Sequence, residues 1–218
     1  MKLFNLESPL MRALARIGDL IILNFVWIIC CIPIVTIGAA TTAMYSCYLN
    51  RSTESSTLRR FFRSFKINFA QSTVLFVVEV VGLLVVYANI RFYLSYLSDV
   101  SIVLQIVFMI PSILILSIMG YIFPLQAHFD NTIKQTLKNA MLMCIANFPF
   151  SLLILCINLI PIIIILINVE FFLKISIIFI LMGSTTIAFV NSFLLLRVFR
   201  HYVPNDEDVE QEGTNSYE

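Results

Sequence analysis

One carboxyl group in the sequence could do chemistry inside a membrane. Glu79 lies in an apolar stretch, residues 69–90, between valines and without a basic residue in that stretch. An acidic side chain at the middle of a bilayer is costly, so we expect Glu79 to face the interior of a helical bundle. Loss of water favours the neutral carboxyl at such a place. Glu79 is therefore the candidate intramembrane functional acid, suited to proton or ion coupling.

Motifs for enzymatic chemistry are missing. The sequence has no GxSxG, no HExxH and no glycine-rich phosphate loop. His128 and Asp130 are two residues apart, a spacing that does not bring side chains together on a helix. We interpret the five cysteines as free, buried and apolar, because no CxxC or Cys/His spacing occurs among them. We therefore predict a protein that is not an enzyme and holds neither a metal nor a cofactor.

The composition places these residues in a membrane protein. Of 218 residues, 60% are hydrophobic and 12% are charged, and the mean hydropathy is +0.94. Soluble domains carry about 25% charged residues. Apolar runs of roughly 20 residues match a hydrocarbon layer about 30 Å thick. We expect an all-α, polytopic transmembrane bundle in the lipid bilayer, with one domain over residues 1–200. Its five spans are expected near residues 17–36, 69–90, 102–123, 142–167 and 175–196.

The two ends of the chain differ from this apolar body. Leucines at helical spacing predict a short interfacial helix over residues 1–16. Residues 201–218 are acidic and have too few apolar side chains to fold, so we expect a disordered tail. The net charge of only +1 indicates no nucleic-acid partner.

The first span contains a proline and is followed by small residues. Pro33 lacks a backbone donor and should kink or end the helix. Beyond it, small residues four apart, such as Gly38 and Thr42, allow a second helix to approach closely. Two interpretations stay open for this run: a helix-packing face, or a permeation or substrate role for its threonine hydroxyls.

The length of this region presents a second choice. Residues 17–50 as one helix would measure about 51 Å, far more than the hydrocarbon layer. Either residues 36–50 protrude on one side, or the chain turns back at Pro33 as a re-entrant pair. Two full crossings are not expected, because each half would have only about 16 residues.

A basic segment separates the first two spans. Residues 51–68 contain five Lys and Arg residues but only one glutamate. Phenylalanines alternate with these basic residues in the sequence and fall on one face of the predicted helix. This pattern is typical of an amphipathic helix on anionic lipid, and it also suits a docking surface for a cytoplasmic partner. The candidate cytoplasmic docking residues are Arg59, Arg60, Arg63, Phe65, Lys66, Lys138 and Asn139.

The distribution of basic residues predicts the orientation. With five crossings, nine Lys and Arg residues lie on the side of the 51–68 segment and the C-terminus, and five lie on the other. The positive-inside rule then places the C-terminus in the cytoplasm and the N-terminus outside. If the chain turns back at Pro33, the N-terminal bases join the majority and the counts become twelve and two.

Three segments carry a family resemblance. PIVTIGAATTAMY at residues 33–45, FFRSFKINFAQS at 61–72 and FPLQAHFDNTIKQTLKNAML at 123–142 resemble the YesL-like family of bacterial integral membrane proteins, whose function is unknown. The resemblance extends over about residues 17–200. Members are often encoded near carbohydrate ABC importers and sensor kinases. The packing positions that it implies are Pro33, Thr36, Gly38, Thr41, Ala43 and Tyr45.

Two functional hypotheses follow. The first is a non-enzymatic accessory protein of the cell membrane, associated with carbohydrate ABC import or its sensing, with transporter or sensor-kinase subunits as partners. The alternative is a small proton- or ion-coupled transporter or channel that uses Glu79 and forms a homo-oligomer.

Overall fold

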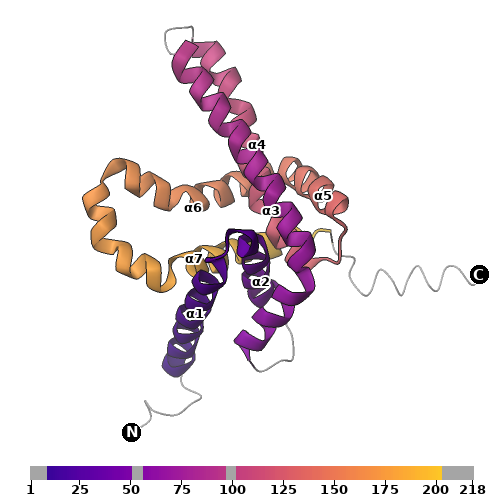
Figure 1. Cartoon of the computed structure of the whole chain (residues 1–218), viewed down its shortest axis with the longest axis vertical. Coiled ribbons are helices and arrows are strands. Elements are labelled where there is room, and N and C mark those ends of the chain that lie inside the picture. Colours follow the sequence, from indigo (N-terminus) through magenta and orange to yellow (C-terminus); the bar gives the residue numbers. More distant parts are fainter. Residues whose placement is uncertain (1–8, 51–55, 97–101, 203–218) are drawn as a thin grey trace, which may run out of the picture.

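The computed structural model describes residues 9–50, 56–96 and 102–202, and these residues are almost wholly helical (Figure 1). The helices are α1 (Pro9–Cys31), α2 (Ile37–Leu49), α3 (Thr57–Tyr96), α4 (Ile102–His128), α5 (Ile133–Ala146), α6 (Phe148–Ile167) and α7 (Val169–Phe199), with a 3-10 turn at Ile34–Thr36. Four of them, α3, α4, α6 and α7, are long and apolar enough to cross a membrane. The expected all-α fold is confirmed, and the chain is a multi-pass membrane protein.

The first two helices form a hairpin. Helix α1 ends before Pro33, and the hydroxyl of Thr36 donates to the carbonyl of Cys30 across the turn. The indole Nε1 of Trp27 donates to the hydroxyl of Thr41 at 3.3 Å, so α2 runs back along α1 (Figure 1). The chain therefore reverses at Pro33, which is the re-entrant alternative. Residues 36–50 do not continue the first helix.

This reversal changes the N-terminal layout. Helices α1 and α3 both start in the lower part of Figure 1, and Asp19 and Leu23 in the middle of α1 line one pocket with Thr57 at the start of α3. The layout with twelve basic residues on one side and two on the other fits this hairpin. Helix α1 is continuous from Pro9, so residues 9–16 are not a separate interfacial helix. Residues 1–8 lie outside the described part.

Helix α2 is the centre of the packing, because it contacts α1, α3, α4 and α7. Its small residues are buried. A Cβ added at Gly38 would overlap the backbone oxygen of Ser72 and lie 2.8 Å from the Cβ of Phe76. The hydroxyl of Thr42 is also 2.9 Å from that of Ser72. The small residues thus pack α2 closely on α3, as expected for a helix-packing face.

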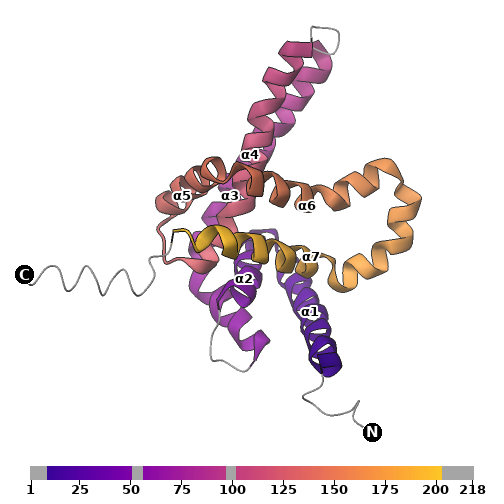
Figure 2. The ribbon, with the colours of Figure 1, turned by 180° about the vertical axis from the view of Figure 1, so that it is seen from behind.

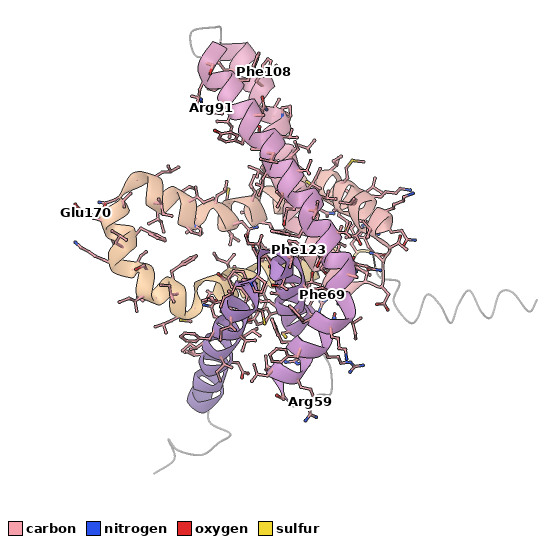
Figure 3. All side chains as sticks on the ribbon, viewed as in Figure 1. Arg59, Phe69, Arg91, Phe108, Phe123 and Glu170 are labelled. Carbon is pink, nitrogen blue, oxygen red and sulfur yellow. The ribbon has the colours of Figure 1, made fainter. Side chains whose placement is uncertain are left out.

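Two long hairpins extend from this centre. Helices α3 and α4 form one, in which Nδ2 of Asn89 donates to the carbonyl of Phe108 at 2.8 Å. Helices α6 and α7 form the other. The two diverge away from α2 (Figures 1 and 2). Arg91 and Glu170 lie near their outer ends, and Arg59 lies at the opposite end of α3 (Figure 3).

Several helix bounds differ from the expected ones. Helix α3 joins the basic segment and the second span, because no glycine or proline interrupts residues 57–81. The polar connection between the spans expected near residues 102–123 and 142–167, for which a loop over residues 126–139 is expected, is mostly helical, since α4 continues to His128 and α5 begins after Thr132. The hydroxyl and backbone of Thr132 form a capping box with Gln135. Helices α6 and α7 cover the last two expected spans. Residues 203–218, which hold nearly all of the expected acidic tail, lie outside the described part.

A buried amide joins the first hairpin to α7. Asn24 is fully buried, and its Nδ2 donates to the carbonyl of Ile180 at 2.6 Å. Its Oδ1 accepts from the backbone N–H of Thr185 at 3.2 Å. The side chain thereby bonds one donor and one acceptor of the α7 backbone. A polar side chain buried in an apolar setting requires such partners inside the protein.

We expect Asn24→Leu to destabilise the protein by about 1–3 kcal/mol, because two hydrogen bonds between α1 and α7 are lost. The melting temperature of the purified protein in detergent measures this. Ile29→Leu is the matched control, since Ile29 lies on the same helix and is 62% exposed. Equal melting temperatures for both variants would contradict the bridging role of Asn24.

Candidate functional site

Glu79 lines a hollow between four helices. The hollow has a volume of about 300 Å³ and is bounded by α2, α3, α4 and α6. Besides Glu79, its polar lining comes from Thr41, Tyr45 and Asn158, and the rest is mainly apolar. Its walls come from α2, from both helices of the α3–α4 hairpin and from α6, and α4 contacts the other three.

The position of Glu79 follows from the length of α3. Ten residues separate it from Phe69, where the apolar part of α3 begins, which corresponds to about 15 Å along the helix. That is the middle of the hydrocarbon layer. Gly82 and Gly120 bring the neighbouring helices close. A Cβ on Gly82 would lie 2.8 Å from Cε of Met119, and one on Gly120 would lie 3.1 Å from Ile154.

Asn158, a half-buried amide of the lining, connects the hollow to the buried Asn191 of α7. Nδ2 of Asn191 donates to Oδ1 of Asn158 at 2.9 Å and to the Tyr45 hydroxyl at 3.5 Å. Asn158 is thus an interhelical hydrogen-bonder, as its place in an apolar span predicts. Asn191 was missed by the sequence reasoning. Its signal is the same as that of Asn158: a single amide within an apolar helix.

The carboxyl group of Glu79 has no such partner. Among the residues that the structure describes, none donates a hydrogen bond to it, although the Tyr45 hydroxyl and Nδ2 of Asn158 line the same hollow. A carboxyl without a donor is unfavourable in an apolar medium, whether it is charged or neutral. The hollow is therefore complementary to a group that brings a hydrogen-bond donor or a positive charge.

Most of the packing positions implied by the family resemblance form α2 and the turn before it, and only a few line the hollow around Glu79. Pro33 and Thr36 make the turn before α2, while Gly38 and Ala43 are buried in its packing. Only Thr41 and Tyr45 of this set reach the hollow.

The candidate docking residues come from two helices. Arg59, Lys66 and Lys138 are exposed, whereas Phe65 is half-buried and stacks on Phe61 with a centroid distance of 6.2 Å. Arg60 and Arg63 line a separate pocket at the start of α3, and Asn139 is half-buried on α5.

The end of α4 joins these two helices. Nε2 of Gln126 donates to Oε1 of Gln71 on α3 at 2.6 Å. Its Oε1 accepts from the hydroxyl of Thr136 on α5 at 2.8 Å. The basic residues of α3 and α5 therefore flank the same end of α4.

His128 has a packing position in this region. Its Nδ1 lies 2.8 Å from Oδ1 of Asn50, and its ring stacks on Phe199 with a centroid distance of 5.2 Å. It thus links the end of α4 to α2 and α7. Within the described ranges, no three His, Cys, Asp or Glu residues could hold a metal ion together. Cys156 is exposed, contrary to the expectation that every cysteine is buried.

One family comparison finds a match. Residues 20–90 match the family described as "Protein of unknown function, DUF624". The matched stretch includes most of the α1–α2 hairpin and of α3, and therefore both Gly38 and Glu79. No curated protein and no solved structure matches the chain. The match assigns no activity to the protein.

Proposed function

We propose that the protein is a non-enzymatic accessory subunit of a membrane transport or sensing system. In this proposal it holds a transmembrane helix of its partner between the α3–α4 and α6–α7 hairpins. The observation that carries it is the Glu79 carboxyl, which lines an apolar hollow at mid-bilayer depth without a hydrogen-bond donor. A partner helix with a lysine or arginine at that depth would supply the missing group.

The shape of the molecule supports an occupant of this kind. The hairpins contact each other near α2, where the hydroxyls of Tyr121 and Ser151 are 3.0 Å apart. Farther out they diverge (Figures 1 and 2). Leu83 and Ile162 line the hollow and are 49% and 52% exposed. Lipid chains could cover these two side chains, but they would leave the carboxyl without a partner.

The resemblance to the YesL-like family suggests which systems to test. It implies a place beside carbohydrate ABC importers and their sensor kinases, both of which have membrane-spanning helices. The twelve-to-two distribution of basic residues supports a location in the cell membrane with both termini in the cytoplasm.

Co-purification tests the proposal. The tagged protein is isolated from native membranes in a mild, uncharged detergent, and bound proteins are identified by mass spectrometry. We expect one membrane-embedded transporter or sensor subunit in near-equal amount. Recovery of no membrane subunit beyond those that follow an unrelated tagged membrane protein would contradict the accessory role.

Cysteine labelling of intact cells tests the orientation. We introduce Lys66→Cys or Arg91→Cys, one at each end of the apolar part of α3, into a chain whose native cysteines are replaced by alanine. A membrane-impermeant maleimide is expected to label position 91 and to leave position 66 unlabelled until the cells are opened. Labelling of position 66 in intact cells would reverse the layout.

A second candidate function is proton- or ion-coupled transport. The observation that favours it is the 300 Å³ hollow with Glu79 at mid-bilayer depth and Tyr45 and Asn158 beside it. In that case Glu79→Gln abolishes flux in proteoliposomes, while Glu170→Gln, at the end of the α6–α7 hairpin, leaves it intact. Unchanged flux in Glu79→Gln would remove this candidate.

A further inference from the structure

A second pocket lies at the other end of α3, away from Glu79. It has a volume of about 220 Å³ and is bounded by the end of α2, the first turns of α3 and the end of α4. In contrast to the hollow around Glu79, most of its lining is polar. Its charged members are Arg60, Arg63 and Asp130. We propose that this pocket binds a phosphodiester group, with an anionic lipid headgroup as its source.

The strongest indication comes from Arg60. The side chain is half-buried, and its Nε is withdrawn from solvent without a hydrogen-bond partner in the described part of the chain. Buried donors in folded proteins are almost always paired, so an unpaired one indicates a missing acceptor. Arg63 lies three residues on, a spacing that places both guanidinium groups on one side of the helix. Guanidinium groups fit phosphate oxygens in pairs.

Neutral groups extend this donor set. Ser64 and Asn68 also line the pocket, and Nδ2 of Asn68 donates to the Ser64 hydroxyl oxygen at 3.2 Å. In that bond the Ser64 hydroxyl oxygen is the acceptor, so the hydroxyl hydrogen can still donate to a ligand in the pocket. Such hydroxyl groups commonly accompany arginine at phosphate sites.

Two features of the pocket repel a bound anion, so an anion with a low negative charge fits best. Asp130 brings one negative charge, and the ends of α2 and α4 present carbonyl groups with partial negative charge. Asn50 reduces the second effect, since its Nδ2 donates to the carbonyl of Ala127 at 2.8 Å. A phosphodiester carries a single negative charge, whereas a phosphomonoester brings nearly two and would place the second one close to Asp130.

The surroundings of the pocket favour a lipid as the source of the phosphate. Ile67 lines the pocket and is 70% exposed, and the exposed Phe62 is on the same helix. Both precede Phe69, where the apolar part of α3 begins, so the pocket lies at the level of the lipid headgroups. Basic pockets at this level bind anionic headgroups, while the apolar side chains beside them contact acyl chains.

The test measures lipid retained by the full-length protein. The chain is purified in an uncharged detergent, mixed with phosphatidylglycerol and analysed by native mass spectrometry. We expect one tightly held lipid. The double variant Arg60→Gln with Arg63→Gln should weaken its retention at least 10-fold. Each single variant, Arg60→Gln or Arg63→Gln, is compared with Arg59→Gln, which also removes one charge but from an exposed neighbour that does not line the pocket.

The outcomes separate the possibilities. Equal loss in Arg59→Gln and in each single variant would show general attraction between charges and overturn the site. Displacement of the lipid by millimolar inorganic phosphate would support the pocket but assign it to a soluble phosphate. If the double variant does not fold, the proposal is tested on the wild-type protein by its melting temperature with added lipid. Phosphatidylglycerol should raise its melting temperature more than phosphatidylcholine does, and equal shifts would refute the proposal.

Discussion

Gly38→Ala is expected to destabilise the protein by about 3 kcal/mol or more, the upper range for overpacking in a close-packed interior. The added Cβ would overlap the backbone oxygen of Ser72 and approach Cβ of Phe76 to 2.8 Å. Neither atom is the end of a flexible side chain. Helix α2 would therefore have to move away from α3. Because α2 also contacts α1, α4 and α7, this shift would disturb the whole bundle.

Gly18→Ala is the matched control for this experiment. A Cβ at Gly18 in α1 meets nothing within 4 Å. Alanine is the better helix former, so this variant should be neutral or more stable by up to about 1 kcal/mol. Thermal unfolding of both variants in the same detergent gives the comparison. Similar melting temperatures for Gly38→Ala and the wild type would show that α2 and α3 are not in close contact.

Glu79→Leu is expected to reduce capture of the membrane partner by about 10- to 100-fold, since a hydrogen bond to a charged group contributes about 1.5–3 kcal/mol. Glu79→Gln should give an intermediate loss, because the amide accepts a hydrogen bond without carrying charge. Capture is measured as the amount of partner that follows the tagged chain from native membranes. Glu170→Leu is the control, since Glu170 lies near the outer end of the α6–α7 hairpin (Figure 3).

The stability of Glu79→Leu separates a binding role from a structural one. No described residue donates a hydrogen bond to the Glu79 carboxyl, so its removal breaks no such bond in the fold. We expect the melting temperature of the isolated protein to stay the same or to rise. A large fall in melting temperature, or full capture of the partner by the leucine variant, would contradict the binding role.

The class of the fold could be predicted because few kinds of backbone structure can cross the hydrocarbon layer of a bilayer. Long apolar runs can cross a bilayer only as helices or closed barrels, and the four long helices follow from those runs. The reversal at Pro33 could not be decided in the same way. Proline ends or kinks a helix without fixing the direction of the next one. Here the direction depends on contacts such as the Trp27–Thr41 hydrogen bond.

The helix ends were less predictable than the apolar runs. Helix α3 begins well before its apolar part, because charged and aromatic residues continue a helix without a visible boundary. Helix α5 was missed although its capping box of Thr132 and Gln135 is a readable signal.

The site was predictable only in part. Glu79 stood out because an acid in an apolar run has few acceptable surroundings. The residues around it could not be assigned, since Tyr45, Asn158 and Asn191 come from three other helices. A lone polar residue indicates an inward face but not its partner. Similarly, a run of basic residues did not reveal that Arg60 lines a pocket while its neighbour Arg59 is exposed.

Photocrosslinking in native membranes shows whether the hollow beside Glu79 receives a helix of another protein. A photoreactive amino acid replaces Leu83, which lines the hollow, or Val81, which is 54% exposed and does not line it. We expect position 83 to give an adduct with one other membrane protein. That adduct should disappear in Glu79→Leu and be absent at position 81. Adducts at position 83 with lipid alone or with a second copy of this chain, or the same protein adduct from both positions, would contradict this expectation.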